Sequence, residues 1–236
     1  MTSWLRGPRA FALAGILSVL IAGALVAASL AGRSDEQAAP DPPAALDSTE
    51  TSRLLAGVPQ NGTVLGRPDA PVTLVEYGDL QCPYCSAWTQ AALPVLVDEY
   101  VRPGKLRIEF RGMAFLGPES ETGLRAALAA GEQDKLWHVV DLLYRNQGHE
   151  NSGWLSDETL RLVGSSVEGL DIERMLDRRE AMSAALDESE ASAAAAGITG
   201  TPSFQVGLTG GRLTRVPISS LDAEALRPAI EALLSR

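Results

Sequence analysis

The chain has 236 residues, a formal charge of −10 at pH 7 and only two cysteines. This length suits one membrane segment followed by one domain with a core of its own. The first 33 residues contain three arginines and no acid, so the rest of the chain carries −13. Such a surface repels phosphate backbones, which argues against nucleic acid as a partner. Two cysteines are also too few for a scaffold built from disulfides.

An uncharged segment runs from Ala10 to Gly32. At about 1.5 Å per residue it spans roughly 34 Å, enough to cross the hydrocarbon core of a bilayer. Arg6 and Arg9 precede it and only Arg33 directly follows it, a bias that places the N-terminus in the cytoplasm and the domain outside. We therefore expect residues 1–33 to form a cytoplasmic stub and a single-pass anchor in the cell membrane. The alternative is a cleaved signal peptide, which would leave a secreted or periplasmic domain.

Residues 34–60 are polar and rich in alanine and proline, so we expect a flexible linker. The folded domain is predicted for residues 61–236. Its first half contains a strand over Val72 to Tyr77, a helix to about Val101 and a strand over Leu106 to Arg111. This order predicts a βαβ unit with a parallel pair of strands.

The second half of the domain begins with a long helical stretch. From about residue 113 to 197 the apolar residues recur with helical periodicity. Two strands follow, over Ser203 to Leu208 and Arg212 to Val216, and Leu221 to Leu234 has the pattern of an amphipathic helix. The chain therefore predicts an α/β fold with a helical insertion between a βαβ half and a ββα half.

The two cysteines, Cys82 and Cys85, lie at the junction of the first strand and its helix. Near a helix start, free N–H groups and the helix dipole favour a thiolate over a thiol. Cysteines in such places can have pKa values of roughly 3.5–7.5. Cys85, one turn further on, can attack a mixed disulfide formed at Cys82. The spacing therefore predicts a dithiol–disulfide switch.

A zinc site and a purely structural disulfide are the alternatives for this pair. A structural zinc site usually needs four ligands, and neither His138 nor His149 has a partner at ligand spacing. A disulfide that closes so short a loop removes little chain entropy. We therefore favour the redox interpretation and expect neither a metal nor another cofactor.

Three segments resemble a known family. They are EYGDLQCPYC at Glu76–Cys85, the helical segment Leu136–Gln147, and GITGTPSF at Gly197–Phe204. Together they resemble the DsbA-like branch of the thioredoxin superfamily, over the chain from about Gly62 to the C-terminus. The resemblance implies a thioredoxin-like fold and thiol–disulfide oxidoreductase activity.

The resemblance also implies roles for individual residues. The two cysteines would be catalytic and form the reversible disulfide, with Cys82 as the exposed sulfur. Pro202 would be a cis-proline beside them, and Thr201 would offer its backbone to an extended substrate. Pro83 and Tyr84, between the cysteines, are expected to contact substrate.

Glu76 is a further catalytic candidate. It shares a strand face with Val72 and Leu74, so its carboxyl is predicted to point into the core. Burial raises the pKa of a carboxyl, which allows it to accept a proton from Cys85. A solvated glutamate near the strand end is the alternative.

We expect an exported, membrane-tethered oxidase that introduces disulfides into other exported proteins. Its partners would be proteins with thiols or disulfides and a membrane redox partner that regenerates the cysteine pair. An extracytoplasmic reductase and a non-catalytic peptide-binding module with the same fold are the alternatives. A monomer is expected, because no segment before Gly62 resembles the dimerisation region of the family's isomerases.

Overall fold

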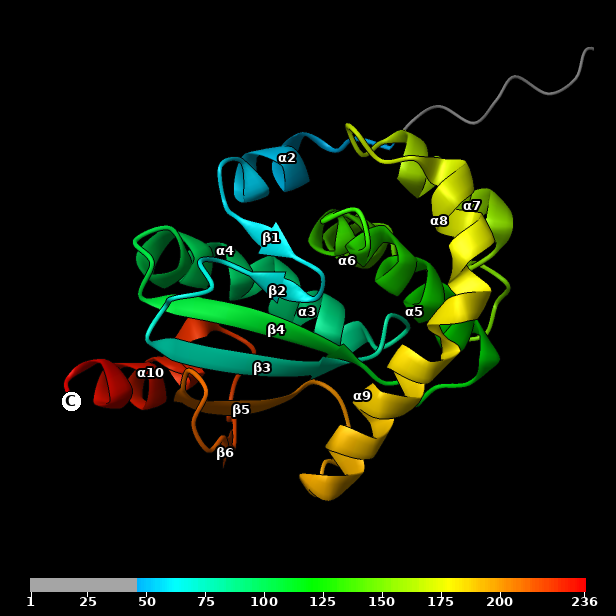
Figure 1. Ribbon diagram of the computed structural model, residues 1–236. Helices are drawn as coiled ribbons and strands as arrows, with labels where there is room; N and C mark the ends of the chain where they lie inside the picture. The colour runs from blue at the N-terminus through cyan, green and yellow to red at the C-terminus, as the bar shows by residue number, and fades with distance from the viewer. Residues whose placement is uncertain (1–45) are drawn as a thin grey trace, which may run out of the picture. The chain divides into compact units, whose positions relative to one another are not determined.

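A mixed sheet lies at the centre of the computed structural model, which describes residues 46–236 (Figure 1). Its strands are β1 (Gln60–Asn61), β2 (Val64–Leu65), β3 (Val72–Gly78), β4 (Leu106–Gly112), β5 (Ser203–Leu208) and β6 (Thr214–Val216). They lie side by side in the order β1-β2-β4-β3-β5-β6. The neighbours β3 and β4 are parallel, and every other neighbouring pair is antiparallel.

Helices connect most of these strands. They are α2 (Thr49–Leu55), α3 (Pro83–Ala91), α4 (Leu93–Leu96), α5 (Pro118–Gly131), α6 (Leu136–Arg145), α7 (Asp157–Ser165), α8 (Ile172–Arg178), α9 (Ser183–Ala195) and α10 (Arg227–Leu234). The predicted order of a βαβ half, a helical insertion and a ββα half is confirmed. The helix expected up to Val101, in which Pro94 was predicted to cause a kink, is divided near Ala92, because Pro94 lacks the N–H that would continue the hydrogen bonds. It ends in a π-helical turn.

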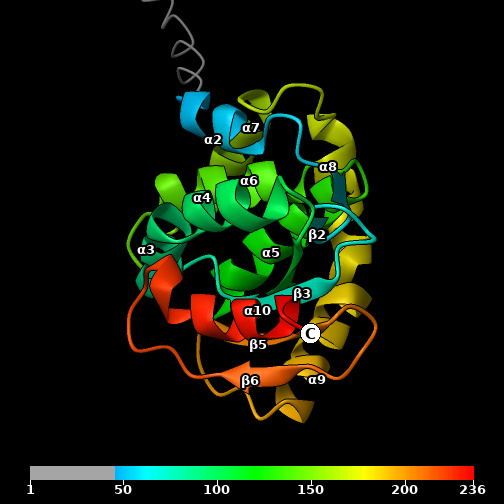
Figure 2. The same cartoon turned by 90° about the vertical axis from the view of Figure 1, so that its left-hand side faces the viewer.

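Strand β3 is buried along its whole length and faces two clusters of apolar side chains. Val72 and Leu74 belong to the main core, to which α3, α4, α6 and α10 contribute. Val75 and Tyr77 belong to a second cluster with Ala193 of α9. Figure 2 shows α10 beside β5, which it contacts together with β3. The end of β3 therefore leads directly into the interior of the protein.

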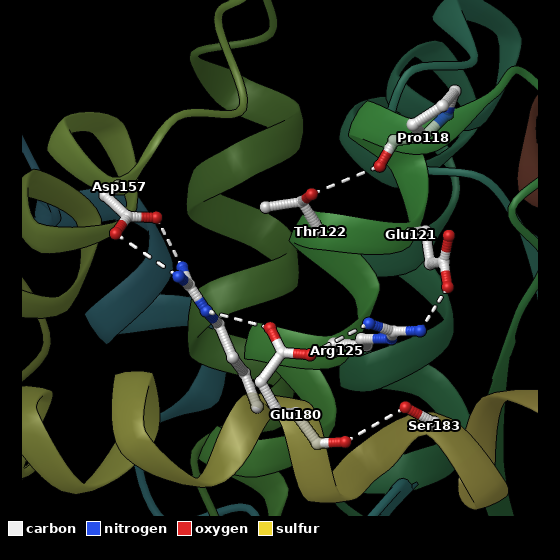
Figure 3. Close-up of polar contacts among 8 residues, drawn as sticks. Pro118, Glu121, Thr122, Arg125, Asp157, Glu180 and Ser183 are labelled. Carbon is white, nitrogen blue, oxygen red and sulfur yellow. Dashed lines mark hydrogen bonds and ion pairs between the residues drawn. The ribbon is translucent and has the colours of Figure 1, made fainter.

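The helical insertion extends from α5 to α9, and α5, α7, α8 and α9 gather beyond one end of the sheet (Figure 1). Two arginines join its helices through ion pairs (Figure 3). Arg125 contacts Glu121 on its own helix and Glu180 on the 3₁₀ turn before α9, and Arg179 contacts Asp157 on α7. Pairs with exposed carboxylates contribute about 0–1 kcal/mol each. Buried apolar side chains therefore supply most of the stability of the insertion.

Helix α2 lies within residues 34–60, which we expected to be a linker, yet it belongs to the folded unit. Leu54 and Leu55 are buried in the main core. The Thr51 hydroxyl donates a hydrogen bond to the buried Asp141 carboxylate on α6. The compact part of the chain therefore begins before residue 61. Seven residues are too few for their apolar positions to show a helical period in the sequence.

The expected membrane anchor at residues 1–33 and the first part of the expected linker lie outside the described residues. Within residues 46–236, no helix has both the length and the apolar character needed to cross a membrane.

Candidate active site

The loop after β3 carries both cysteines into the start of α3. Pro83 is the first residue of the helix, where its missing N–H leaves no hydrogen bond unmade. Cys82 is therefore the N-cap, and its carbonyl accepts hydrogen bonds from the N–H groups of Cys85 (3.1 Å) and Ser86 (3.2 Å). The N–H groups of Tyr84 and Cys85, in the first turn of the helix, also lie where they stabilise a negative charge on the Cys82 sulfur.

Hydrogen bonds lower the pKa of the Cys82 thiol to about 6. The Cys85 thiol is the strongest contributor to this lowered pKa, followed by the Thr201 side chain and the N–H groups of Cys85 and Tyr84, while burial opposes them. Each of these donors stabilises the thiolate form. At neutral pH the Cys82 sulfur is therefore mostly ionised.

The expectation that Cys82 is the exposed sulfur was wrong. Cys82 is only 5% exposed, and Cys85 is fully buried. The physical reason is the loop around Thr201, whose carbonyl oxygen lies 3.4 Å from the Cys82 sulfur. Pro83 and Tyr84, in contrast, face solvent, and 64% of Tyr84 is exposed.

The Thr201–Pro202 peptide bond is cis, as the resemblance implied. It directly precedes β5, whose first residue, Ser203, pairs with Tyr77 near the end of β3. This pairing brings the Thr201 loop next to the cysteine loop. Thr201 and Pro202 are both half-buried, so their backbone reaches the surface beside Cys82.

Glu76 is only 1% exposed, which excludes the alternative of a solvated glutamate. Burial, and then the charge of Cys82, raise the pKa of this carboxyl to about 8. Burial also raises the pKa of Cys85 well above its usual value, and the hydrogen bond and charge of Cys82 and the charge of Glu76 act in the same direction. At neutral pH the site therefore combines a thiolate with a protonated thiol and a protonated carboxyl.

A buried polar network that the sequence did not single out fixes the loop before the cysteines. Asp79 is fully buried, and its carboxylate accepts hydrogen bonds from the Ser120 hydroxyl (2.6 Å) and from the N–H groups of Gln81 and Leu116 (both 2.8 Å). The Gln81 amide donates to Ser120 (3.0 Å) and to Asn151 (3.2 Å). The only signal of this network in the sequence is two polar residues, Asp79 and Gln81, that lie just before Cys82.

Helix α6 and the residues after it reach the same loop. Tyr144 is buried, and its hydroxyl donates to the Asp79 carbonyl (3.2 Å), while its own carbonyl accepts from Ser86 (2.8 Å). The Gln147 side chain donates to the Cys82 carbonyl (3.1 Å). Both residues lie in the segment that resembles the family, but their spacing alone assigned no role to them.

Both cysteines are free thiols in this structure. Among residues 46–236, no group of three or more His, Cys, Asp or Glu side chains is arranged to hold a metal ion. His138 instead shares a hydrogen bond of 3.0 Å with Gln60.

A cysteine pair at a strand-to-helix junction, beside a cis-proline and on a mixed sheet, defines the thioredoxin-like class of proteins. A family model described as "Thioredoxin" matches residues 59–231. The chain belongs to the thioredoxin family.

Relatives and solved structures agree with this family. The probable disulfide bond formation protein D of Bacillus cereus is 36% identical over 113 residues, or 47% of this chain and 52% of that protein. The chain therefore spans about half the length of the curated relatives it matches. A thioredoxin-like oxidoreductase from Silicibacter pomeroyi is 30% identical, with a TM-score of 0.57 over 73% of this chain and 92% of that one. Oxidised BdbD from Bacillus subtilis has the same fold, with a TM-score of 0.64 and 22% identity over 76% of this chain and 98% of that one.

Proposed function

We propose that this protein is a thiol–disulfide oxidase that introduces disulfides into exported proteins through Cys82 and Cys85. One observation carries the proposal: the pKa of Cys82 is lowered to about 6, whereas that of Cys85, one helical turn away, is raised. A sulfur that is stable as a thiolate is a good leaving group, so a disulfide to Cys82 is readily given up. The names of the Bacillus relatives, which refer to disulfide bond formation, support the same direction.

The reaction starts from a Cys82–Cys85 disulfide. A thiolate of the substrate attacks the Cys82 sulfur, the bond between the two cysteines breaks, and Cys85 leaves as a thiolate that takes up a proton. We assign the donation of this proton to the protonated carboxyl of Glu76. A second substrate thiolate then attacks the substrate sulfur, which forms the new disulfide and releases Cys82 as a thiolate. The substrate loses two electrons, and the cysteine pair gains them.

Substrate binding is assigned to the two segments that flank the Cys82 sulfur. The half-buried backbone at Thr201 and Pro202 would pair with an extended stretch of the substrate. Pro83 and Tyr84 are exposed next to Cys82 and would contact the side chains around the substrate cysteine. These contacts favour unfolded or extended substrates, whose cysteines are accessible.

We further propose that residues 1–33 anchor the protein in the cell membrane, with the domain on the extracytoplasmic side. The support is the uncharged run from Ala10 to Gly32 and the arginines on its N-terminal side. In this location a membrane redox partner would accept two electrons from the reduced cysteine pair and restore the disulfide. Cleavage of the segment as a signal peptide would leave the same domain secreted or periplasmic.

Substitution of each cysteine tests the mechanism in the full-length chain. In Cys85→Ser the Cys82 thiolate can still attack a substrate disulfide and displace one of its sulfurs as a thiolate, but Cys85 is not there to attack the resulting adduct, so mixed disulfides with disulfide-containing substrate proteins should accumulate. Cys82→Ser should accumulate almost none, since Cys85 is completely buried and its raised pKa keeps it protonated. Adducts would be counted on non-reducing gels. Adducts on the Cys82→Ser variant alone would reverse the assignment of the two sulfurs.

Trapping of thiols in living cells tests the direction of the reaction. A mainly oxidised cysteine pair is expected for an oxidase, whereas a mainly reduced pair would identify a reductase. A purified chain that neither oxidises a reduced protein nor reduces insulin would instead indicate a peptide-binding module without catalysis.

A further inference from the structure

The buried carboxyl of Glu76 has no cationic neighbour across the sheet. Both of its cross-strand partners are phenylalanines, Phe110 on β4 and Phe204 on β5. One of its oxygens, Oε1, is buried and forms no hydrogen bond with any described residue. Leaving such an oxygen without a partner is costly. The unpaired Oε1 therefore indicates that another group forms a hydrogen bond with it during the reaction.

The hydroxyl of Tyr144 lies on the same side of β3 as this oxygen. Gly78 follows Glu76 by two residues and thus faces the same way. A Cβ atom at Gly78 would lie 2.9 Å from the Tyr144 hydroxyl oxygen and 3.3 Å from Glu76 Oε1. Both oxygens therefore lie close to the same point beside Gly78, where even a Cβ atom would not fit.

The polar surroundings of Glu76 come from three elements. Cys82 and Cys85 lie at the start of α3, Asp79 lies in the loop before it, and Tyr144 projects from α6. Burial, and then the charge of Cys85, raise the pKa of Tyr144, so its hydroxyl stays neutral. That hydroxyl already donates its proton to the Asp79 carbonyl (3.2 Å). It keeps lone pairs that can accept a hydrogen bond.

We propose that a small rotation of the protonated Glu76 carboxyl brings Oε1 within hydrogen-bond reach of the Tyr144 hydroxyl, which then accepts a hydrogen bond from it and so positions the proton that Glu76 exchanges with Cys85. This inference rests on the proposed function. When the cysteine disulfide opens, the Cys85 thiolate takes the proton from Glu76, so the O–H bond breaks and an S–H bond forms. In the reverse step the S–H bond breaks and the proton returns to Oε1, where its hydrogen bond to Tyr144 holds the carboxyl in place. Tyr144 is thus a positioning residue that gains and loses no proton.

Tyr144→Phe removes the hydroxyl and keeps the ring that fills the core. A hydrogen bond to the neutral form of an acid raises its pKa, so losing it should lower the Glu76 pKa by roughly one pH unit. The rate at which Cys85 releases glutathione from a mixed disulfide at Cys82 reports this pKa. Its pH midpoint in the full-length chain should move by the same amount.

Two further variants separate this role from a loss of packing. In a Glu76→Gln background, Tyr144→Phe should leave the pH profile unchanged. Tyr100→Phe is the matched control, because it also removes a buried phenol hydroxyl, one that donates to Glu231 (2.6 Å). It should not move the midpoint. A shift in either of these variants, a shift toward alkaline pH, or no shift in Tyr144→Phe alone would overturn the proposal.

Infrared difference spectroscopy provides a readout that does not depend on thiol exchange. The carbonyl band of protonated Glu76, identified by its absence in Glu76→Gln, should change frequency and titrate at lower pH in Tyr144→Phe. An unchanged band would overturn the hydrogen bond between these two residues. If the band changes but wild-type Cys82 forms no mixed disulfide with glutathione, the hydrogen bond stands and the proposed oxidase function fails.

Discussion

The two sulfurs of the active site differ in charge because their donors differ. Cys82 is the N-cap of α3, and hydrogen bonding by the Cys85 thiol, the Thr201 side chain and backbone N–H groups lowers its pKa. Cys85 lies one turn deeper, where burial dominates and raises its pKa. The same short helix turn therefore creates one nucleophile and one protonated thiol.

Alkylation should separate the two thiols. At pH values near 6, iodoacetamide should modify Cys82 of the reduced protein with a midpoint close to the Cys82 pKa of about 6. Cys85 should react far more slowly, because it is buried and protonated. Mass spectrometry of the two peptides measures both rates. Equal rates at mildly acid pH would contradict the assignment.

Glu76 should make the stability of the domain depend on pH. Its pKa is raised from 4.5 to about 8 in the folded protein, so its stabilising contribution is complete below about pH 4.5 and is lost as the pH rises toward 8. The shift corresponds to at most about 5 kcal/mol. Glu76→Gln should therefore stabilise the protein by roughly 1–3 kcal/mol above pH 8, since a buried amide retains part of the cost.

Urea unfolding of wild type and Glu76→Gln at several pH values measures this difference. The gain should vanish below the ordinary glutamate pKa of 4.5. Glu109→Gln is a suitable control, because Glu109 lies on the neighbouring strand but is partly exposed and paired with Arg111. A gain of the same size at every pH would show that the carboxyl does not titrate as proposed.

The sequence predicted the chemistry of the motif better than its surroundings. Strand alternation placed Glu76 inside, and the resemblance of the segment before Phe204 to a known family implied the cis-proline. Asp79 and Tyr144 were missed because a polar residue in a loop and an aromatic residue on an apolar helix face have ordinary interpretations. Their partners come from distant parts of the chain, and only the fold brings these together.

At the scale of elements, α2 is the clearest departure from expectation. Besides its apolar contacts, its C-terminal end is held by Arg102, which donates to the carbonyls of Ala56 (2.6 Å) and Leu54 (2.7 Å). A guanidinium satisfies the free carbonyls at a helix end and complements the helix dipole. Such a tertiary contact explains how so short a helix is stable.

Truncation of one side chain tests the contribution of α2. Leu55→Ala should lower the free energy of unfolding by about 2–4 kcal/mol, because Leu55 is 3% exposed within the main core. Arg53→Ala is the matched control on the same helix. Arg53 is exposed, and its ion pair with Glu50 should contribute less than about 1 kcal/mol. Equal effects in urea unfolding would show that α2 is not docked.

The long strands and the order of the halves could be predicted because their apolar patterns extend over several residues. The strands β1 and β2 have two residues each, too few to form a pattern. They exist because β2 pairs with the edge of β4. Their conformation depends on a neighbour that lies more than forty residues away in the chain.

For the whole molecule we expect a monomer. Among the described residues, the large apolar side chains that are exposed are Tyr84, Phe115 and Leu208. Obligate dimers bury extensive apolar surfaces, and three such side chains do not form one. Analytical ultracentrifugation of the detergent-solubilised chain should give the mass of one protomer. A concentration-independent dimer would contradict this expectation.

The lowered pKa of Cys82 also couples the redox state of the molecule to its folding. A thiol that ionises more easily in the folded than in the unfolded chain stabilises the reduced fold, with the full effect above the unfolded pKa and none below the folded value of about 6. At pH 7 this amounts to roughly 1 kcal/mol, and it should grow toward about 3 kcal/mol in mildly alkaline solution. Calorimetry at several pH values should show the melting temperature of the reduced form rising relative to that of the oxidised form as the pH increases from 6 to about 8.5. A difference between the two melting temperatures that does not change with pH would contradict this coupling. If the coupling holds, part of the driving force for each disulfide transfer comes from the oxidase itself. Its fold becomes more stable when the cysteine pair is reduced.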